Sequence, residues 1–371
     1  MDFGFSEEQE ELRRGVRRFL EDKSAMSEVR RLMETIDGYD SAVWSQMAVQ
    51  LGLQSLIIPE SYGGAGFGYV ELAVVLEEMG RSLLCAPYFA TVALATNALL
   101  HCGDEAAKSE HLPRIASGEL IATVAYTEPS GRWDLGGIEL EASPAPEGWS
   151  LSGTKSFVLD GHVAGLVLVA ARAPAGLSLL AVDGDAPGLA RSPLATMDQT
   201  RKQAKLDFSS TPARLIGGEG EAGPLLEKTL DLAAVALAAE QVGGAQRVLE
   251  MSVDYAKTRI QFGRPIGSFQ AIKHKCADML LEVESAKSAA YYAAWAAAED
   301  NDELPVTACL AKAYCSEAYF HAAAENIQIH GGIGFTWEHD AHLYFKRAKS
   351  SELILGDPAY HRELLAQRIG I

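Results

Sequence analysis

The sequence lacks several features that would place it in whole classes of protein. It contains no run of about 18 apolar residues, so we predict no transmembrane helix. It opens with MDFGFSEEQEELRR, which is acidic and amphipathic rather than a basic start followed by an apolar stretch. We therefore expect a cytoplasmic protein without membrane insertion. Basic side chains are outnumbered, with 32 Lys and Arg against 50 Asp and Glu, and the formal net charge of -18 argues against a nucleic-acid partner.

Cysteine is also scarce. The five cysteines, at positions 85, 102, 276, 309 and 315, include no C-x-x-C pair. We expect buried, reduced thiols rather than disulfides. The cluster EHDAH at 338–342 matches no zinc signature and is interpreted as the solvated start of a helix, so we predict no metal site.

What the sequence does contain is a helical part, a strand-rich part and a second helical part. Residues 1–120 carry helical periodicity, with Ser6 as the expected N-cap of the first helix and Gly52 closing a later one. Residues 121–215 are short apolar runs separated by Gly, Pro, Asp and Ser, which favours antiparallel strands in a small barrel or sandwich. Residues 224–371 are long alanine-rich helical stretches that suit a four-helix bundle. The predicted class is therefore an α+β multidomain protein with these three domains.

Four segments in this order resemble the acyl-CoA dehydrogenase family. The strand-rich part opens with YTEP at 126–129, and LSGTKSFVLDG at 151–161 is similar to the family's N-G-x-K-x-W-I segment. The stretch YAKTRIQFGRPIGSFQAIKHKCADM at 255–279 resembles the R-x-x-F-G…Q segment. The stretch NIQIHGGIGFTWEHDAHLYFKRAK at 326–349 resembles the Q-x-x-G-G-x-G-[FY] segment. The resemblance covers essentially the whole chain.

This resemblance implies an FAD cofactor, a CoA thioester substrate and a tetramer. In such enzymes a glutamate removes the α-proton while the β-hydrogen leaves as hydride to the flavin. Each FAD lies at a dimer interface, with much of its ADP half held by the neighbouring subunit. The residues that match the family's cofactor contacts are Tyr126, Thr127, Arg259, Gln261, Phe262, Phe269, Gln270, Gln328, Gly331 and Gly332.

The chemistry of these residues supports the cofactor assignment independently. Arg259 has a forked, permanently charged guanidinium that suits a pyrophosphate. Phe262 and Phe269 could form a wall against an adenine or flavin edge. Gln270 and Gln328 donate hydrogen bonds without adding charge, and the glycines of HGGIG allow a backbone to approach a phosphate or ribose closely. Taken singly, each motif is also compatible with an ordinary surface arginine or a helix end.

The catalytic base of the family is missing. Aligned without gaps from GGIGF, Leu355 in KSSELILGDPAYHRELL takes the position of the family's glutamate. Some members carry the glutamate on the first helix of the bundle instead, and that position is Ala233. Neither side chain can remove a proton. The sequence therefore assigns no catalytic residue to this chain.

Other groups expected around the substrate are also replaced. Ala234 stands where the family has an arginine beside the thioester, and Leu159 stands where it has a Ser or Thr hydroxyl near flavin N5. Arg132 and Trp133 replace small residues and would crowd the mouth of the pocket. The residues offered to a neighbour's FAD are intact, whereas those that build the chain's own pocket are eroded. This asymmetry predicts a non-catalytic subunit that completes a partner's flavin site in a heterotetramer, as in two-subunit actinobacterial members that act on steroid side-chain thioesters.

Two alternatives stay open. The chain could be a self-sufficient homotetrameric dehydrogenase with a displaced base, for which the candidates are Asp231, Glu240, Glu352 and Asp357. It could also be a flavin-free binding or scaffold protein of the same fold, since a fold does not guarantee an activity. Flavin absorbance of the purified protein separates the last possibility from the others.

Overall fold

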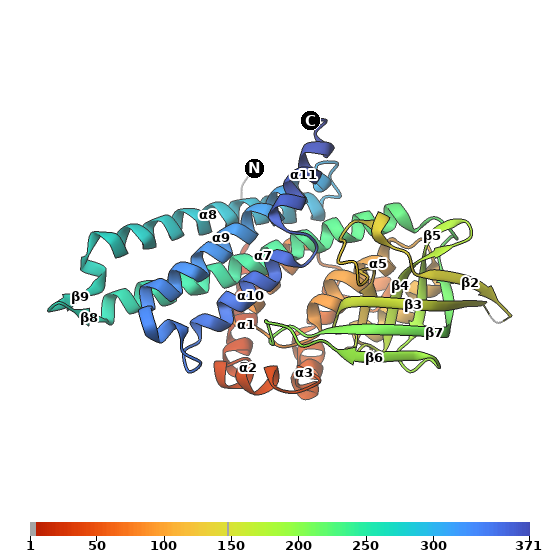
Figure 1. Ribbon diagram of the computed structural model, residues 1–371, viewed down its shortest axis with the longest axis horizontal. Helices are drawn as coiled ribbons and strands as arrows, with labels where there is room; N and C mark the ends of the chain where they lie inside the picture. The colour runs from red at the N-terminus through yellow and green to blue at the C-terminus, as the bar shows by residue number, and fades with distance from the viewer. Residues whose placement is uncertain (1–4, 147) are drawn as a thin grey trace. The chain divides into compact units, whose positions relative to one another are not determined.

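The computed structural model describes residues 5–146 and 148–371, which form two compact units (Figure 1). Unit 1 contains the chain up to Val29, Tyr69–Leu84 and Ala234–Ile371. Unit 2 contains Arg30–Gly68 and Cys85–Ala233. Helices α2 (Met26–Met33) and α7 (Ala222–Thr258) each run from one unit into the other. The elements of each unit are described separately below.

Unit 1 is built from long helices. They are α1 (Glu7–Lys23), α4 (Tyr69–Arg81), the larger part of α7, α8 (Gln270–Ala298), α9 (Leu304–His330), α10 (Ala341–Leu353) and α11 (Pro358–Arg368). The predicted cap of the first helix is confirmed: Ser6 accepts from the N–H of Gln9, and the Gln9 side chain accepts in return from the N–H of Ser6. This reciprocal capping box fixes where α1 begins.

Helices α4 and α7 approach each other closely at two glycines. A Cβ atom at Gly243 would lie 1.7 Å from the Glu77 carbonyl oxygen, and one at Gly80 would lie 1.9 Å from the Glu240 carbonyl oxygen. Both distances are far inside van der Waals contact, so any larger residue would force the helices apart.

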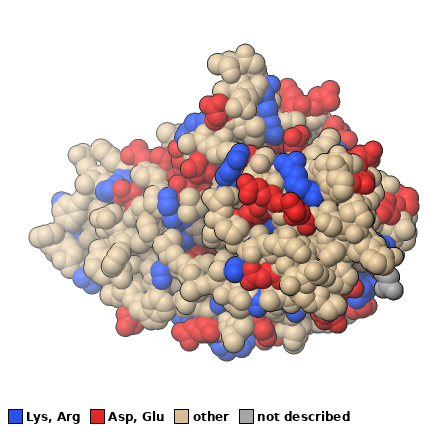
Figure 2. Space-filling model, turned by 45° about the vertical axis from the view of Figure 1, so that its right-hand side comes forward, with Lys and Arg blue, Asp and Glu red and all other residues tan. Residues whose placement is uncertain are grey.

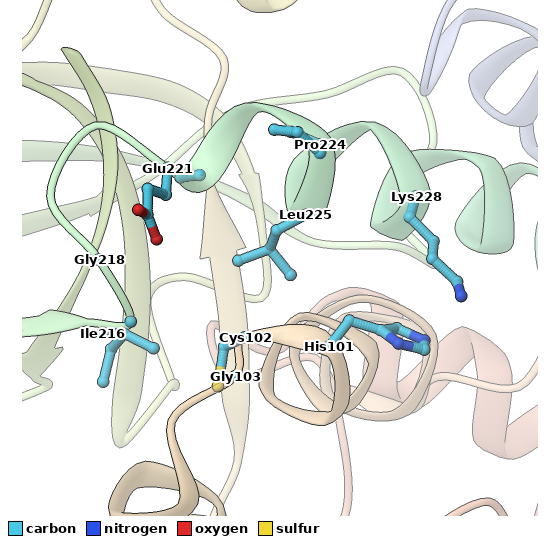
Figure 3. A pocket seen from close by; sticks show the side chains of 11 residues that line it. His101, Cys102, Gly103, Ile216, Gly218, Glu221, Pro224, Leu225 and Lys228 are labelled. Carbon is cyan, nitrogen blue, oxygen red and sulfur yellow. The ribbon is translucent and has the colours of Figure 1, made fainter.

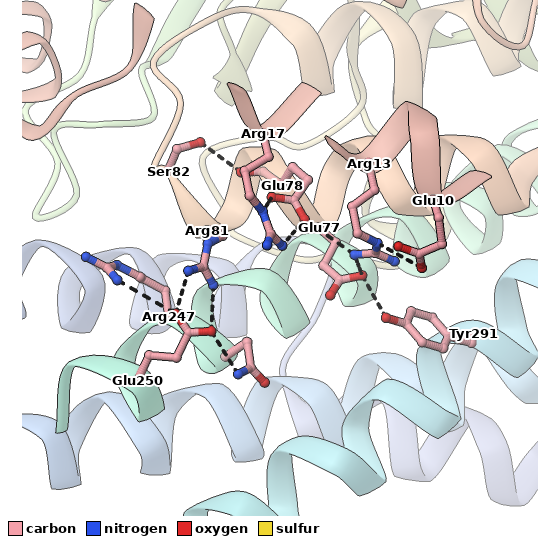
Figure 4. A network of polar contacts seen from close by, with 11 residues as sticks. Glu10, Arg13, Arg17, Glu77, Glu78, Arg81, Ser82, Arg247, Glu250 and Tyr291 are labelled. Atoms are coloured by element: carbon pink, nitrogen blue, oxygen red, sulfur yellow. Dashed lines mark hydrogen bonds and ion pairs between the residues drawn. The ribbon is translucent and has the colours of Figure 1, made fainter. Parts of the chain in front are cut away.

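This close contact is flanked by ion pairs that join α1 and α7 to α4 (Figure 4). The buried carboxylate of Glu78 receives two hydrogen bonds from Arg17, at 2.7 and 2.8 Å. The carboxylate of its neighbour Glu77 forms an ion pair with Arg13 at 2.8 Å and accepts a hydrogen bond from the Tyr291 hydroxyl at 2.7 Å. Arg81 binds Glu250 of α7 through both terminal nitrogens. Adjacent carboxylates on α4 thus have cationic partners that offset the cost of their burial.

Unit 2 combines short helices with a β-sheet. The helices are α3 (Ser41–Leu51), which ends at Gly52 in a left-handed conformation as predicted, α5 (Asn97–His101) and α6 (Glu105–Ala116), with a π-helical segment at Phe89–Thr96. The strands are β1 (Ala122–Ala125), β2 (Glu141–Ala145), β3 (Gly148–Leu159), β4 (Leu166–Ala173), β5 (Gly176–Asp183), β6 (Leu189–Pro193) and β7 (Gln203–Ile216).

The sheet closes on itself. Its order is β1-β4-β2-β3-β7-β5 with β6 beside β7, and β5 also pairs with β4. Leu151, Leu168, Leu179 and Leu206 are completely buried among its residues. The predicted barrel is therefore confirmed, with one correction. Two pairings are parallel, β1 with β4 and the short contact of β2 with β4, so the sheet is mixed rather than purely antiparallel.

The expectation that all the thiols are buried is partly corrected. The five cysteines form no disulfide, and four are buried, but Cys276 on α8 is partly exposed. Acidic side chains are frequent on the surface, in keeping with the net charge of -18. Figure 2 shows many Asp and Glu side chains on the face in view, beside wide areas that carry neither sign. Within residues 5–146 and 148–371, no helix is long and apolar enough to cross a membrane.

A buried lysine holds the loop between α10 and α11. The side chain of Lys312 on α9 is 0% exposed. Its ammonium group donates three hydrogen bonds of 3.0 Å each, to the Ser316 hydroxyl and to the carbonyl oxygens of Glu352 and Gly356. Burial lowers the pKa of Lys312 to about 7. The loop is held from the other side by His361, whose Nε2 donates to the Leu355 carbonyl at 2.9 Å.

We predict that Lys312→Met destabilises the protein by about 1–3 kcal/mol, because buried carbonyl groups lose their donor. The variant should also change the pH dependence of stability. The pKa of Lys312 in the folded protein, about 7, is below the ordinary lysine value of about 10.4, so the unfolded chain binds more protons between these values. The free energy of unfolding therefore rises with pH across this window, and the variant should lose that rise.

Urea unfolding of both proteins at pH 7 and pH 9 measures the two effects. Lys273→Met, which removes an exposed lysine on α8, serves as the control. Equal stability of Lys312→Met and the parent, or the same slope with pH, would contradict the assigned role.

Candidate functional site

A hairpin between α7 and α8 carries most of the predicted cofactor residues. Strands β8 (Ile260–Gln261) and β9 (Arg264–Pro265) pair antiparallel and leave Phe262 and Gly263 as a two-residue turn. Both turn residues have positive φ, 53° and 76°, as a type I′ turn requires. Phenylalanine rarely adopts this conformation, and strained backbone of this kind concentrates at functional sites.

The hairpin presents polar and aromatic groups outward. Phe262 is 90% exposed, and its ring meets that of Phe269 edge-on with centroids 6.0 Å apart. Arg259, Gln261 and Gln270 are exposed, and their side chains have no hydrogen-bond or ion-pair partner among the residues that the structure describes. An exposed guanidinium and two carboxamides without partners can bind an anionic, ring-bearing ligand.

The second predicted segment follows α9. Gln328 is exposed near the end of this helix, and Gly331 and Gly332 begin a 3-10 turn at Gly331–Phe335. Gly331 has φ 64° and ψ -144°, a conformation that only glycine adopts readily. A Cβ atom at either glycine would meet nothing within 4 Å. The backbone at these two glycines is uncrowded, so a ligand can approach it closely.

The structure brings the two segments together within unit 1. The ring of Tyr255, four residues before Arg259, stacks on His330 with centroids 4.2 Å apart. Below this stack, the Ser252 hydroxyl of α7 donates to Asn326 of α9 at 2.9 Å. The Tyr255–His330 stack is a site feature that the sequence did not reveal, because nothing in either motif indicates which aromatic rings meet.

Tyr126 and Thr127 lie in unit 2 and are buried. The Thr127 hydroxyl donates to the Ser156 carbonyl, and the Thr127 carbonyl accepts from the N–H of Ser156 at 3.0 Å. The next residue, Glu128, accepts from Lys155 at 2.7 Å. Burial acts to raise the pKa of Glu128, but Lys155 and nearby peptide N–H groups outweigh it and lower that pKa. The YTEP segment thus has a clear structural role, and its contact with a cofactor stays a prediction.

The two positions that the sequence predicts for the family's base, Leu355 and Ala233, are apolar and buried. Leu355 lies in the loop held by Lys312, with a φ of 65° that is unfavourable for leucine. Ala233 and Ala234 are buried on α7, and Leu159 is buried at the end of β3. Arg132 is different: it is exposed and binds Asp134 through two nitrogens. The Trp133 ring lies 6.3 Å from that of Tyr126.

The carboxylates considered as displaced bases are engaged in structural contacts. Glu240 forms a buried ion pair with Arg347 at 2.9 Å. Glu352 accepts from Lys349 with both oxygens at 3.0 Å. Asp357 caps α11 by accepting from the N–H of Tyr360 at 2.8 Å. The fourth candidate, Asp231, is buried and is also engaged.

The cavities described here lie away from the predicted residues. One of about 420 Å³ in unit 2 lies where α7 begins, lined by His101 and Cys102 on one side and Glu221, Leu225 and Lys228 on the other (Figure 3). Another of about 510 Å³ in unit 2 contains His111 and Arg214. A third of about 240 Å³ in unit 1 lies beside Arg17, Arg81 and Arg247. The predicted cofactor residues of unit 1 instead form an open surface.

Comparison with known proteins supports the predicted family along nearly the whole chain. Three family models match: the acyl-CoA dehydrogenase N-terminal domain at residues 6–119, the middle domain at 123–210 and the C-terminal domain at 223–370. "Acyl-CoA dehydrogenase IpdE2" of Mycolicibacterium smegmatis is 38% identical over 355 residues, which are 95% of this chain and 96% of that protein.

Solved structures agree as well. A variant of the "Tcur3481-Tcur3483 steroid ACAD" superposes with a TM-score of 0.89 at 33% identity, covering 98% of each chain. The "ChsE4-ChsE5 complex from Mycobacterium tuberculosis" superposes with a TM-score of 0.90 at 30% identity, covering 100% of this chain and 99% of the other. The chain therefore belongs to the acyl-CoA dehydrogenase family, whose members are flavoprotein oxidoreductases that act on CH-CH donors.

Proposed function

We propose that this chain is a subunit of an FAD-dependent acyl-CoA dehydrogenase that completes the flavin site of a partner chain and supplies no catalytic base. The observation that carries the proposal is Leu355, a buried leucine at the position that the sequence resemblance assigns to the family's glutamate. An alkyl side chain cannot accept the α-proton of a thioester, whatever its orientation.

The residues of the hairpin fit the ADP half of FAD. Arg259 offers a forked cation for the pyrophosphate, and Gln261, Gln270 and Gln328 offer uncharged donors. The bare backbone at Gly331 and Gly332 leaves room for a phosphate or ribose. When bound, FAD supplies a hydride acceptor. The role of this chain's residues is to bind and orient that cofactor.

The lack of a base is supported by the other carboxylates. Glu240 is held in a buried ion pair and Asp357 caps α11, whereas Glu352 binds Lys349 in a partly exposed pair three residues apart. Moving Glu240 toward a substrate would break its buried ion pair with Arg347, which is strongly unfavourable. A self-sufficient enzyme with a displaced base is therefore the weaker alternative.

The partner would be a second chain of the same family that provides the base. Two similar structures are described as two-chain assemblies, Tcur3481-Tcur3483 and ChsE4-ChsE5. The first is called a steroid ACAD, so the proposed substrate is the CoA thioester of a bulky acyl chain such as a steroid side chain. A homotetramer is the alternative assembly.

The direct test is to purify the chain alone and after co-expression with the product of the neighbouring open reading frame. We expect little or no turnover of any acyl-CoA by the chain alone, since loss of a general base costs about 10²–10⁴-fold in rate. The complex should contain both chains, bind FAD and turn over. Robust activity of the single chain would overturn the proposal. A folded protein without flavin absorbance would favour a flavin-free scaffold.

Arg259→Ala should weaken FAD retention by the assembled protein about 10- to 100-fold, the effect expected for loss of one charge-assisted contact. FAD per complex after dialysis, measured by absorbance, reports the effect. Arg18→Ala removes another exposed arginine, on α1, and should leave FAD content unchanged. Full retention in Arg259→Ala would contradict the cofactor assignment.

Leu355→Glu should not create activity in the chain alone. A carboxylate would be restored, but Leu159 and Ala234 would still replace the hydroxyl and the arginine expected around the substrate. Misplacing a substrate by about 1 Å already costs about 10²-fold. A glutamate at this buried position would also have a raised pKa and be protonated near neutral pH.

Steady-state assays of the purified variant, alone and with its partner, measure this outcome. Thermal unfolding checks that the variant is folded. Turnover by Leu355→Glu alone at a rate typical of the family would mean that the pocket is otherwise intact, and that the leucine is a single lesion.

A further inference from the structure

Histidines gather where α9 gives way to α10, next to the Gly331–Gly332 turn. The ring of His330 lies between Tyr255 of α7 and His339, with centroid distances of 4.2 and 4.5 Å. His330 is 7% exposed. The turn folds directly over it, because a Cβ atom at Gly334 would lie 2.9 Å from the Cβ of His330. The position of the His330 ring therefore sets the position of the turn.

The hydrogen bonds of the pair are those of neutral imidazoles. His330 donates from Nδ1 to the Asn326 carbonyl at 2.8 Å, so its second proton would have to be added at Nε2. His339 accepts at Nδ1 from the N–H of Ala341, at 3.1 Å, where α10 begins. Protonation of that nitrogen would break the contact and place a positive charge at a helix N-terminus, where cations are disfavoured.

The groups that contact His330 offer little compensation for a charge on its ring. His330 faces Tyr255 from α7, the Asn326 carbonyl from its own helix and His339 from the segment before α10. None of these is a carboxylate. Burial, opposed by the Asn326 bond and assisted by His339, lowers the pKa of His330.

The segment that follows His339 carries a further histidine. His342 stacks on Trp337 with centroids 4.9 Å apart, and Lys346 already lies 4.7 Å from the face of the same indole. Two carboxylates, Glu338 and Asp340, flank His339 in the sequence. The charge of Asp340 acts on Tyr344. A second cation beside Trp337 would be repelled by Lys346.

We propose that the His330–His339 pair is an acid-sensitive latch on the cofactor-binding turn. While both rings are neutral they hold Gly331 and Gly332 in the observed conformation, and mild acidification separates the rings and releases the turn. The direction follows from linkage: a folded-state pKa below the ordinary value of about 6.5 means that the packed form loses stability as pH falls below that value. The consequence for FAD rests on the proposed function, whereas the opening of the turn does not.

Hydrogen exchange of the intact chain at pH 7.5 and pH 5.5, corrected for the intrinsic rates, tests the latch. Protection of residues 328–342 should fall about fivefold at the lower pH, which corresponds to a closed-form pKa about one unit below the ordinary value of about 6.5. Protection of 308–316, in the middle of α9, should not change.

Two variants separate titration from packing. His339→Asn keeps an oxygen that can accept from the N–H of Ala341 but cannot titrate, and His330→Phe keeps a ring against Tyr255. Each should reduce the pH response to less than about threefold. His321→Asn, which removes an exposed histidine elsewhere on α9, should respond as the parent does. An unchanged response in both variants, or equal protection of the parent at the two pH values, would overturn the latch.

FAD content of the assembled protein at the same pH values distinguishes this inference from the proposed function. Opening of residues 328–342 together with loss of FAD supports both. Opening without loss of FAD supports the latch and counts against the cofactor assignment. Loss of FAD while the segment stays protected overturns the latch, because acid then acts elsewhere.

Discussion

The close packing of α4 against α7 is the contact on which unit 1 depends. At Gly80 and Gly243 each helix presents its backbone to the other, so no side chain keeps them apart. The closeness puts Arg81 of α4 within reach of Glu250 of α7, while the buried carboxylates of Glu77 and Glu78 join α4 to the arginines of α1. With α7 held in this way, the hairpin at its end has a rigid base, and a binding surface on rigid elements is more precise than one on a free loop.

The same helix illustrates the asymmetry of this chain. Toward its C-terminal end, α7 leads into Arg259 and the hairpin, where exposed donors are kept available. In its N-terminal half, Ala233 and Ala234 offer only methyl groups, and Glu240 forms a buried ion pair with Arg347. A protein under no constraint would be expected to lose both ends alike. Intact donors for a neighbour beside an inert interior are what a subunit needs when its partner performs the chemistry.

Much of the fold could be predicted from the sequence because the signals are local. Ser6 with Gln9 three residues later, and Gly52 after an apolar run, mark helix ends directly. The mixed sheet could not be predicted, since parallel pairing of β1 with β4 is a contact between distant segments. Nor could the burial of Lys312, because an alanine-rich helix gives no sign of which face is covered. The capping role of Asp357 is predictable from the sequence, because an aspartate directly before a proline is typical of a helix start. The candidate cofactor residues are predicted from motifs alone, whereas the stack of Tyr255 on His330 depends on tertiary packing.

The surface around the hairpin has a consequence for how the protein must be made. Large apolar side chains are exposed there at Ile260, Phe262, Ile333, Phe335 and Trp337. Exposed apolar side chains of this size favour self-association and precipitation when nothing covers them. A cell that makes more of this chain than of the protein that covers the surface would accumulate an aggregation-prone excess. Under the proposed function, balanced synthesis of the two chains is what keeps this surface covered.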